Sequence, residues 1–336
     1  MHVHSVSWRI KKNIETSQTR LFFPITMTNK EQYLSFCQQH PEIPLFQQAW
    51  WMQCVAGHKE WDVLLIRNEQ NEIIAFLPYL IVRKYGFRMV LQPLLSQCNG
   101  LWTRSDVATD KEISNKIISE VEKLNLHWFM QYFPSSTLLD PWIDKEYKIS
   151  HRHTYVIESI QQSPETIFQR FSSAQKRQIK KAERNGIVVK EGHCAADFYQ
   201  FHTSCLKQRG EKNLNLPDVE VTLCEEAMKR EMGALLYAID HTGKTLAALF
   251  LAWDSTTAYY MIPVYDNEEK SSGASSLLVW HGILLAQQKG LSRFDFEGSM
   301  QPSIAQYYKQ FGSTETEYPQ IEKINHPLIK LWKKIR

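Results

Sequence analysis

The sequence lacks a Cys-x-x-Cys pair, and it lacks any apolar run near the roughly 18–20 residues that a membrane helix needs. Its six cysteines lie far apart, which argues for reduced thiols and against a disulfide framework or a cysteine zinc site. No apolar h-region with a small-residue cleavage site is visible near the start, so no signal peptide is predicted. These absences predict a cytoplasmic protein with no integral membrane span.

The sequence also lacks a strong charge of either sign. A net charge of +3 over 336 residues is too small to indicate a nucleic-acid binder by itself, so any basic patch has to be local. His151 and His153 have no third ligand at metal spacing, and we predict no metal site. With 43% hydrophobic and 22% charged residues, the chain is expected to fold and is long enough for two domains.

The stretch from Thr257 to Gly312 contains the clearest pattern. A β-rich run from Thr257 to Val264 precedes a helical pattern that starts after Ser271-Ser272-Gly273 and ends at Gly290. A second strand is predicted from Ser292 to Phe296. Strand, helix and strand in this order predict two parallel strands with a right-handed crossover. The free N–H groups at the helix start predict a phosphate site.

The order of elements repeats along the chain. Each half is predicted to contain helices, a three-strand meander, a helix and a strand, although side-chain identity between the halves is negligible. The expected fold class is α+β, with domains at 1–145 and 146–336. Before this pattern, the sequence predicts a possible strand at Arg20 to Pro24, a helix that starts at a capping box of Thr28 and Glu31, and an aromatic-rich helix over 45–55. His151 and His153 lie in the predicted linker between the halves. The predicted strands cover 61–67, 72–82, 87–91, 127–132, 234–239, 245–253, 257–264 and 292–296, and the crossover helices start at 110 and 274.

Two motifs carry a family resemblance. Phe294-Asp295-Phe296-Glu297-Gly298-Ser299 and Tyr308-Lys309-Gln310-Phe311-Gly312 resemble the C-terminal half of tandem GNAT-fold acyltransferases, a group that includes the Fem-type transferases and BioF2-like acetyltransferase domains. The resemblance implies two tandem GNAT-like domains, each with a mixed, mostly antiparallel sheet flanked by helices. It implies a degenerate first domain and an active cleft in the second.

The resemblance also implies where the donor and an anionic group would bind. In a GNAT domain, the segment Ser271, Ser272, Gly273, Ala274 and Ser275 would hold the pyrophosphate of an acyl-CoA co-substrate. A helix bracketed by Ser172 and Asn185-Gly186 presents a cationic stripe. This stripe is either a solvated face or an anion site for a diphosphate, a nucleotide or an RNA backbone. By position and charge, the Fem-type pattern places substrate-binding residues at Arg177, Lys180 and Lys181.

Acyl transfer to an amine needs a base, a proton donor for the leaving group and stabilisation of the oxyanion. Glu297, at the end of the second strand, is the candidate base. Asp295 either binds substrate or pairs structurally with Arg293. Lys309 matches a lysine that the Fem-type pattern carries at the active site, and Tyr308 is a candidate proton donor, although an aromatic beside Phe311 is also typical of a core.

The function we expect is N-acyl transfer from an acyl thioester (acyl-CoA) to an amine on a small-molecule, cell-envelope or polysaccharide-related acceptor. One alternative is a Fem-type transferase that takes an amino acid from charged tRNA to a peptidoglycan precursor. Another is a non-catalytic binding protein with the same fold. The tail HPLIKLWKKIR forms a basic amphipathic segment, for which we weigh peripheral membrane contact against docking on the second domain.

Overall fold

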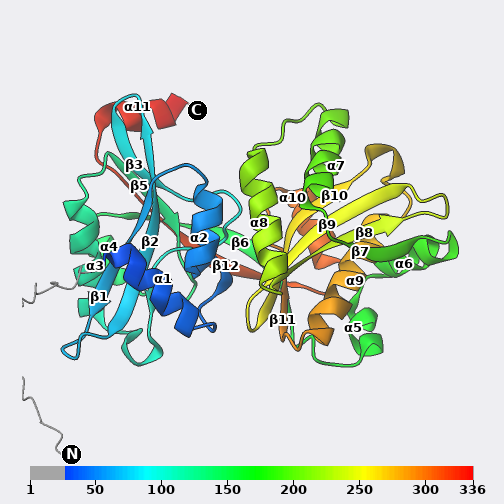
Figure 1. Cartoon of the computed structure of the whole chain (residues 1–336), viewed down its shortest axis with the longest axis horizontal. Coiled ribbons are helices and arrows are strands. Elements are labelled where there is room, and N and C mark those ends of the chain that lie inside the picture. The colour runs from blue at the N-terminus through cyan, green and yellow to red at the C-terminus, as the bar shows by residue number, and fades with distance from the viewer. Residues whose placement is uncertain (1–26, 336) are drawn as a thin grey trace, which may run out of the picture.

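The computed structural model describes residues 27–335, so the possible strand at Arg20 to Pro24 lies outside the described residues. Two halves lie side by side and share one mixed sheet of twelve strands (Figure 1). The sheet order is β1-β2-β3-β5-β12-β6-β11-β10-β9-β8-β7, with β4 paired to β2. The architecture is therefore α+β, as the sequence predicted.

The first half follows the predicted order closely. Thr28 caps α1 through a capping box with Glu31, as expected. The predicted helix over 45–55 is instead a 3-10 turn followed by α2, because Gln48 at the junction is extended. Strands β1, β2, β3 and β5 and helix α3 lie where their patterns predicted them. The bounds are α1 Asn29–Gln39, η1 Leu45–Gln47, α2 Ala49–Ala56, β1 Trp61–Arg67, β2 Ile73–Lys84, β3 Phe87–Leu91, β4 Trp102–Thr103, η2 Ser105–Val107, α3 Lys111–Lys123, β5 Trp128–Tyr132 and α4 Asp140–Asp144.

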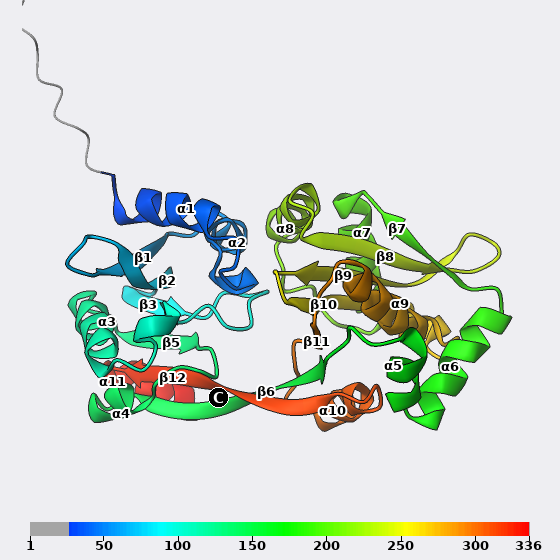
Figure 2. The same ribbon diagram turned by 90° about the horizontal axis from the view of Figure 1, so that it is seen from below.

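The two halves are joined by two long strands that the sequence reasoning missed. The segment with His151 and His153, expected to be a linker, belongs to β6, and β12 follows the last motif. The two strands pair antiparallel along their length and form a ribbon that runs through both halves (Figure 2). The far end of β12 also pairs with β5 of the first half. The predicted domain boundary at residues 145/146 therefore divides the sequence, whereas the sheet is continuous from one half to the other.

The second half contains the predicted parallel pair. Strands β10 and β11 are parallel and connected by α9, and Gly290 after this helix has a φ of 78°. The bounds are β6 Lys148–Glu158, α5 Pro164–Arg170, α6 Ser173–Arg184, β7 Val188–Gly192, α7 Ala195–Gln208, α8 Pro217–Lys229, β8 Gly233–Ile239, β9 Thr245–Trp253, β10 Thr257–Tyr265, η3 Asn267–Glu269, α9 Ala274–Gln288, β11 Arg293–Asp295, α10 Pro302–Lys309, β12 Thr314–Ile324 and α11 Pro327–Ile335.

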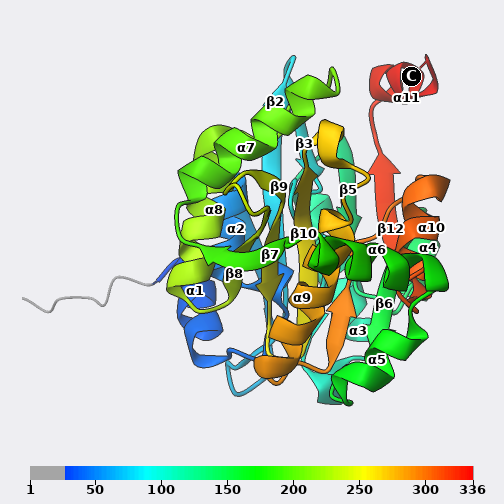
Figure 3. The ribbon, with the colours of Figure 1, turned by 90° about the vertical axis from the view of Figure 1, so that its right-hand side faces the viewer.

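Helices cover both faces of the sheet (Figure 3). One face carries α1, α2, α7 and α8, which share a single core with residues of both halves, among them Trp51, Tyr259 and Cys205. The other face carries α3 and α4 over the first half, and α5, α6, α9 and α10 over the second. The common core on the first face, together with the β6–β12 ribbon, holds the halves in one arrangement.

Candidate active site

The gap between β10 and β11 is the central feature of the second half. The strands pair at only three positions, and the last pair is Tyr259 with Asp295. A register shift in β10 between Tyr260 and Ile262 marks a bulge, which bends the strand at this point. Beyond Asp295, β10 continues to Tyr265 without a partner on that side. The sheet is therefore open at the carboxyl ends of two parallel strands, where open sheets usually bind ligands.

A cavity of about 460 Å³ lies beside this opening, between α6, α9, α10 and β10. We call it the α9 cavity. It lies on the face of the sheet where Tyr260 and Tyr308 pack. Burial raises the pKa of Tyr307 to about 12 and raises the pKa of Tyr308 as well, so both phenols are protonated at neutral pH. The lining residues are Gln175, Gln178, Ala248, Tyr260, Pro263, Val264, Tyr265, Lys270, Gly273, Ser275, Ser276, Leu278, Ser303, Ile304, Tyr307 and Tyr308.

The predicted donor segment lies only partly in the α9 cavity. Gly273 and Ser275 line it, whereas Ala274 is buried and the carbonyl of Ser271 accepts a hydrogen bond from Lys181 Nζ at 2.8 Å. Ser272 Oγ accepts the N–H of Ala274 at 3.2 Å. The Leu277 N–H donates to the Gly273 carbonyl at 3.0 Å, so the N–H groups of Ser275 and Ser276 are the ones left in the first turn of α9, and both residues line the cavity.

Gly273 is needed for packing as well as for conformation. Its φ is 89°, and a Cβ there would lie 2.3 Å from the carbonyl oxygen of Gln178 on α6. Helix α6 therefore contacts the loop before α9 directly. Its inner edge contributes two cavity residues that the sequence reasoning missed, Gln175 and Gln178, and Gln175 Oε1 accepts a hydrogen bond from Ser276 Oγ at 2.6 Å.

On the opposite face, Asp295 and Glu297 form a carboxylate cluster with Gln97 and Thr154. Asp295 pairs in register with Tyr259, so its side chain lies on the face away from the α9 cavity. Asp295 Oδ1 accepts hydrogen bonds from the Thr154 hydroxyl and, at 2.8 Å, from the Glu297 N–H. Gln97 Nε2 from the first half lies 3.3 Å from both oxygens. This hydrogen-bonding, rather than the expected pair with Arg293, holds Asp295; Arg293 pairs with Glu158 at 3.0 Å.

Glu297 has an unusual backbone. Its φ is 62°, and Gly298 follows with a φ of 73°. A Cβ at Gly298 would lie 2.1 Å from the carbonyl oxygen of His153 on β6, so only glycine fits here. Left-handed conformation at a glutamate is costly and is typical of a residue that the surrounding structure holds in a special position.

The electrostatics of the carboxylate cluster favour protonation. Burial raises the pKa of Asp295 to about 6. Burial, and then the neighbouring charge of Asp295, raise the pKa of Glu297 well above its ordinary value. Glu297 Oε1 is buried and has no hydrogen-bond partner within the described part of the chain. A carboxyl group with a raised pKa and a free oxygen has the properties of a general acid or base.

Lys309 lies apart from this cluster. Its ammonium pairs with Glu315 Oε2 at 2.7 Å and lies 5.5 Å from the ring centre of Tyr155. Among residues 27–335, it makes no hydrogen bond or ion pair with Glu297. Tyr308 stacks on Phe296 at 4.6 Å and lines the α9 cavity. The structure therefore brings Tyr308 to the cavity and Asp295 to Glu297, and it does not bring Lys309 to either.

The predicted cationic stripe forms the outer side of α6. Ser172 caps this helix, as expected. Lys181 contacts Ser271, and Lys176 Nζ donates to the carbonyl of Gln169 at 2.8 Å. Arg177 and Lys180 are exposed, and neither forms an ion pair with another described residue. Two cations on the outer side of α6 are therefore available to an anion.

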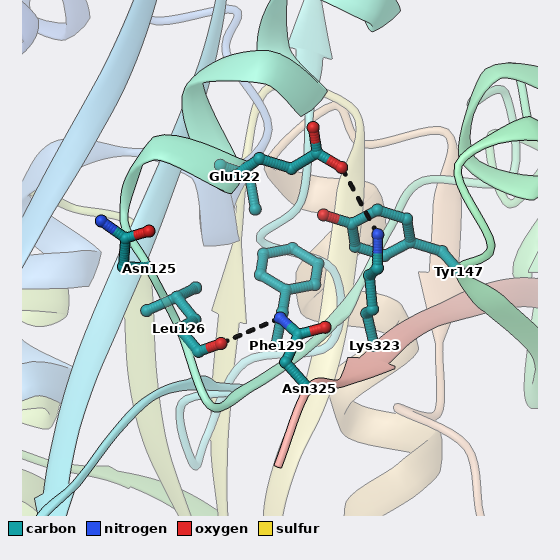
Figure 4. A pocket seen from close by; sticks show the side chains of 8 residues that line it. Glu122, Asn125, Leu126, Phe129, Tyr147, Lys323 and Asn325 are labelled. Carbon is teal, nitrogen blue, oxygen red and sulfur yellow. Dashed lines mark hydrogen bonds and ion pairs between the residues drawn. The ribbon is translucent and has the colours of Figure 1, made fainter.

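A second cavity, of about 400 Å³, lies in the first half between α3, β5 and the end of β12 (Figure 4). Its charged side chains pair with each other, because Lys323 Nζ lies 3.4 Å from Glu122 Oε1, and Asn325 Nδ2 donates to the carbonyl of Leu126 at 2.9 Å. The other lining residues are Val121, Asn125, Phe129 and Tyr147. Because these groups pair internally, this cavity lacks the free acid and base that the carboxylate cluster offers.

Residues 169–310 match the family model described as "Acetyltransferase (GNAT) domain". This part of the chain matches a GNAT acetyltransferase domain, and the chain shares the tandem GNAT fold over most of its length. The solved structure of FemX aligns with a TM-score of 0.70 at 12% identity, over 91% of this chain and 98% of that one. A search of curated proteins gives no match.

Two further solved structures share the fold. The C-terminal domain of a putative lysylphosphatidylglycerol synthetase from Agrobacterium fabrum aligns with a TM-score of 0.60 at 8% identity, over 91% of this chain and 96% of that one. A tandem GNAT protein from the clavulanic acid biosynthesis pathway aligns with a TM-score of 0.53 at 10% identity, over 89% and 95%. At these identities the likeness defines the fold alone.

Proposed function

We propose that this protein transfers an acyl group from a thioester donor, acyl-CoA, to an amine of a cell-envelope or polysaccharide-related acceptor. One observation carries the proposal: the sheet opens after the Tyr259–Asp295 pair, with the α9 cavity on one face and the free carboxyl of Glu297 on the other. A donor in the cavity and an acceptor beside Glu297 would meet at this opening.

The donor would bind through the start of α9. The N–H groups of its first turn and the positive end of its dipole suit a pyrophosphate, and Gly273 and Ser275 line this end of the cavity. Lys270, which also lines the cavity, adds a cation that the sequence reasoning did not consider. The acyl arm would then run along Tyr260 and Tyr308 toward the gap.

Glu297 would act as the base. Its raised pKa places proton exchange nearer to neutral pH, and its unpaired oxygen can accept a proton from the acceptor ammonium before attack, or from the amine nitrogen as it attacks the thioester. Asp295 would position Glu297, because it holds the Glu297 N–H. Tyr308, protonated at neutral pH, would return a proton to the leaving thiolate. Lys309 has no part in this scheme, because Glu315 holds its ammonium.

The test separates donor binding from chemistry. We expect calorimetric titration with acetyl-CoA to show binding, and Ser275→Phe to weaken it by filling the cavity, whereas Ser119→Phe on the exposed side of α3 leaves it unchanged. Glu297→Gln should keep donor binding and lower kcat by about 10²–10⁴-fold. No binding at millimolar acetyl-CoA would overturn the donor assignment, and full turnover of Glu297→Gln would overturn the base.

A second candidate is aminoacyl transfer from charged tRNA to a peptidoglycan precursor, which the exposed Arg177 and Lys180 favour. In this case Arg177→Glu with Lys180→Glu should abolish retention of tRNA on a filter. The matched pair Lys116→Glu with Lys190→Glu, elsewhere on the surface, should retain it. Retention that is absent in the unmodified protein would remove this candidate.

A further inference from the structure

Helix α11 presents an apolar face on which Leu328, Leu331 and Ile335 are exposed. It docks on the first half, and not on the second as one interpretation of the tail expected. Ile329 is buried, the Lys333 ammonium pairs with Glu322, and Trp332 lies 6.5 Å from Trp128 between ring centres. The helix is thus fixed in orientation by contacts on one side.

The exposed side of α11 is a regular stripe. Leu328, Leu331, Trp332 and Ile335 are spaced by three and four residues, so they fall within about 100° of the helix circumference. All four are at least half exposed, and Ile335 is 79% exposed. Trp332 lies at the edge of this stripe, beside Trp128 of β5, so the stripe begins at the surface of the first half.

Two other segments expose large apolar side chains at the same end of the molecule. Tyr85, at the turn between β2 and β3, is 86% exposed, and Leu214 and Leu216 are exposed in the connection between α7 and α8. In Figures 1 and 3, which share their vertical axis, α11, the β2–β3 turn and the α7–α8 connection all lie at the upper end. We call these three segments the apolar end.

The charges of the apolar end are mainly positive. Lys84, Lys212, Lys330 and Lys334 are exposed, and none of them forms an ion pair with another residue in 27–335. Glu211 in the α7–α8 connection pairs with Arg209, and Glu322 of β12, beside α11, pairs with Lys333. Exposed apolar side chains beside free lysines are typical of surfaces that bind the headgroup region of an anionic bilayer.

The shape of the apolar end argues against a protein partner. Helix α11 has nine residues and is therefore about 13 Å long, and the other two segments are separate projections. A stable protein interface buries roughly 800 Å² on each partner in a continuous, complementary patch. Separate tips with apolar side chains need no complementary surface in a fluid bilayer, where each inserts independently.

We propose that the apolar end binds the surface of an anionic lipid bilayer, with the stripe of α11, Tyr85 and Leu214 in the headgroup region and the lysines on lipid phosphates. In this orientation, the end of both halves that lies at the top of Figure 1 would face the lipid. This proposal does not depend on the acyl-transfer reaction, since binding to vesicles is measured without donor or acceptor.

The test is flotation of the full chain with vesicles of phosphatidylcholine containing phosphatidylglycerol, compared with pure phosphatidylcholine. We expect binding to the anionic vesicles that weakens as salt rises. Lys330→Gln with Lys334→Gln should weaken it by about fivefold per lysine. Leu331→Gln with Ile335→Gln should abolish it, and because both side chains are exposed, these variants should keep the fold.

Matched variants elsewhere on the surface provide the controls. Lys116→Gln with Lys190→Gln, and Ile143→Gln with Val188→Gln, make the same chemical changes at exposed positions of α3, α4 and β7 and should float as the unmodified protein does. The proposal would be overturned if all variants floated equally, or if the unmodified protein did not float with anionic vesicles. The double variant Leu331→Gln with Ile335→Gln could instead change the oligomeric state and float as before. That result would also overturn the proposal, because it would mean that the stripe binds a second copy of the chain.

Discussion

The substitution Asp295→Asn tests the electrostatics of the carboxylate cluster most directly. Asp295 is 4% exposed, and burial raises its pKa from the ordinary 3.8 to about 6. A carboxyl group with a raised folded pKa stabilises the protein fully below its unfolded pKa. That contribution is lost as the pH rises through the folded pKa. At roughly 1.4 kcal/mol for each pKa unit, this shift amounts to about 3 kcal/mol, which is lost as the pH rises from below 3.8 to above 6.

Asparagine removes this loss while it keeps most of the geometry. The hydrogen bonds from Thr154 and the Glu297 N–H both go to Oδ1, which asparagine retains. The longer contacts with Gln97 are lost or rearranged, at a cost of about 1 kcal/mol that does not vary with pH. We therefore expect Asp295→Asn to be slightly less stable than the unmodified protein near pH 4 and about 2 kcal/mol more stable near pH 7.5.

Urea unfolding followed by tryptophan fluorescence, from pH 4 to pH 8, measures this difference. Asp144→Asn, at an exposed position of α4, controls for the chemical change and should leave the pH dependence as it is. Stability curves of Asp295→Asn and the unmodified protein that run parallel over this range would refute the reasoning. They would mean that Asp295 is solvated, or already ionised, in the folded protein.

Two other predictions concern packing. Gly298→Ala should lower the unfolding free energy by about 2 kcal/mol or more, because it combines left-handed strain with a Cβ 2.1 Å from a backbone oxygen. Gly186→Ala, at a similar φ of 72° with open space around it, should lower it by only about 1 kcal/mol. Equal losses of the two variants in urea unfolding would contradict this account. Glu220→Ala removes a fully buried carboxylate that His202 and Asn215 contact at 2.8 Å, so it should lower the unfolding free energy by about 3 kcal/mol. As a control, Glu225→Ala at an exposed position should change the unfolding free energy by less than about 0.5 kcal/mol. A small effect of Glu220→Ala would mean that this polar network is not needed for stability.

Local patterns determined much of this fold. The capping box at Thr28, the parallel pair β10 and β11 and the helix between them follow from short-range rules, and the structure contains each of them. The same motif pointed to Glu297 at the end of β11. These features depend on residues close together in sequence, where backbone sterics, capping and periodicity act.

The arrangement of the site depended on contacts between distant residues. Pairing of β12 with β5 and β6 joins strands more than 150 residues apart, and Gln97 reaches Asp295 across 198 residues. No local pattern encodes such partners, because they are chosen by which surfaces bury one another. The motif placed Asp295 and Glu297 two residues apart where the strand ends, whereas only the packed sheet put Lys309 with Glu315 and separated it from them. The sequence alone thus determined many of the helices and strands and pointed to Glu297 as the candidate base, and tertiary packing decided what surrounds this residue.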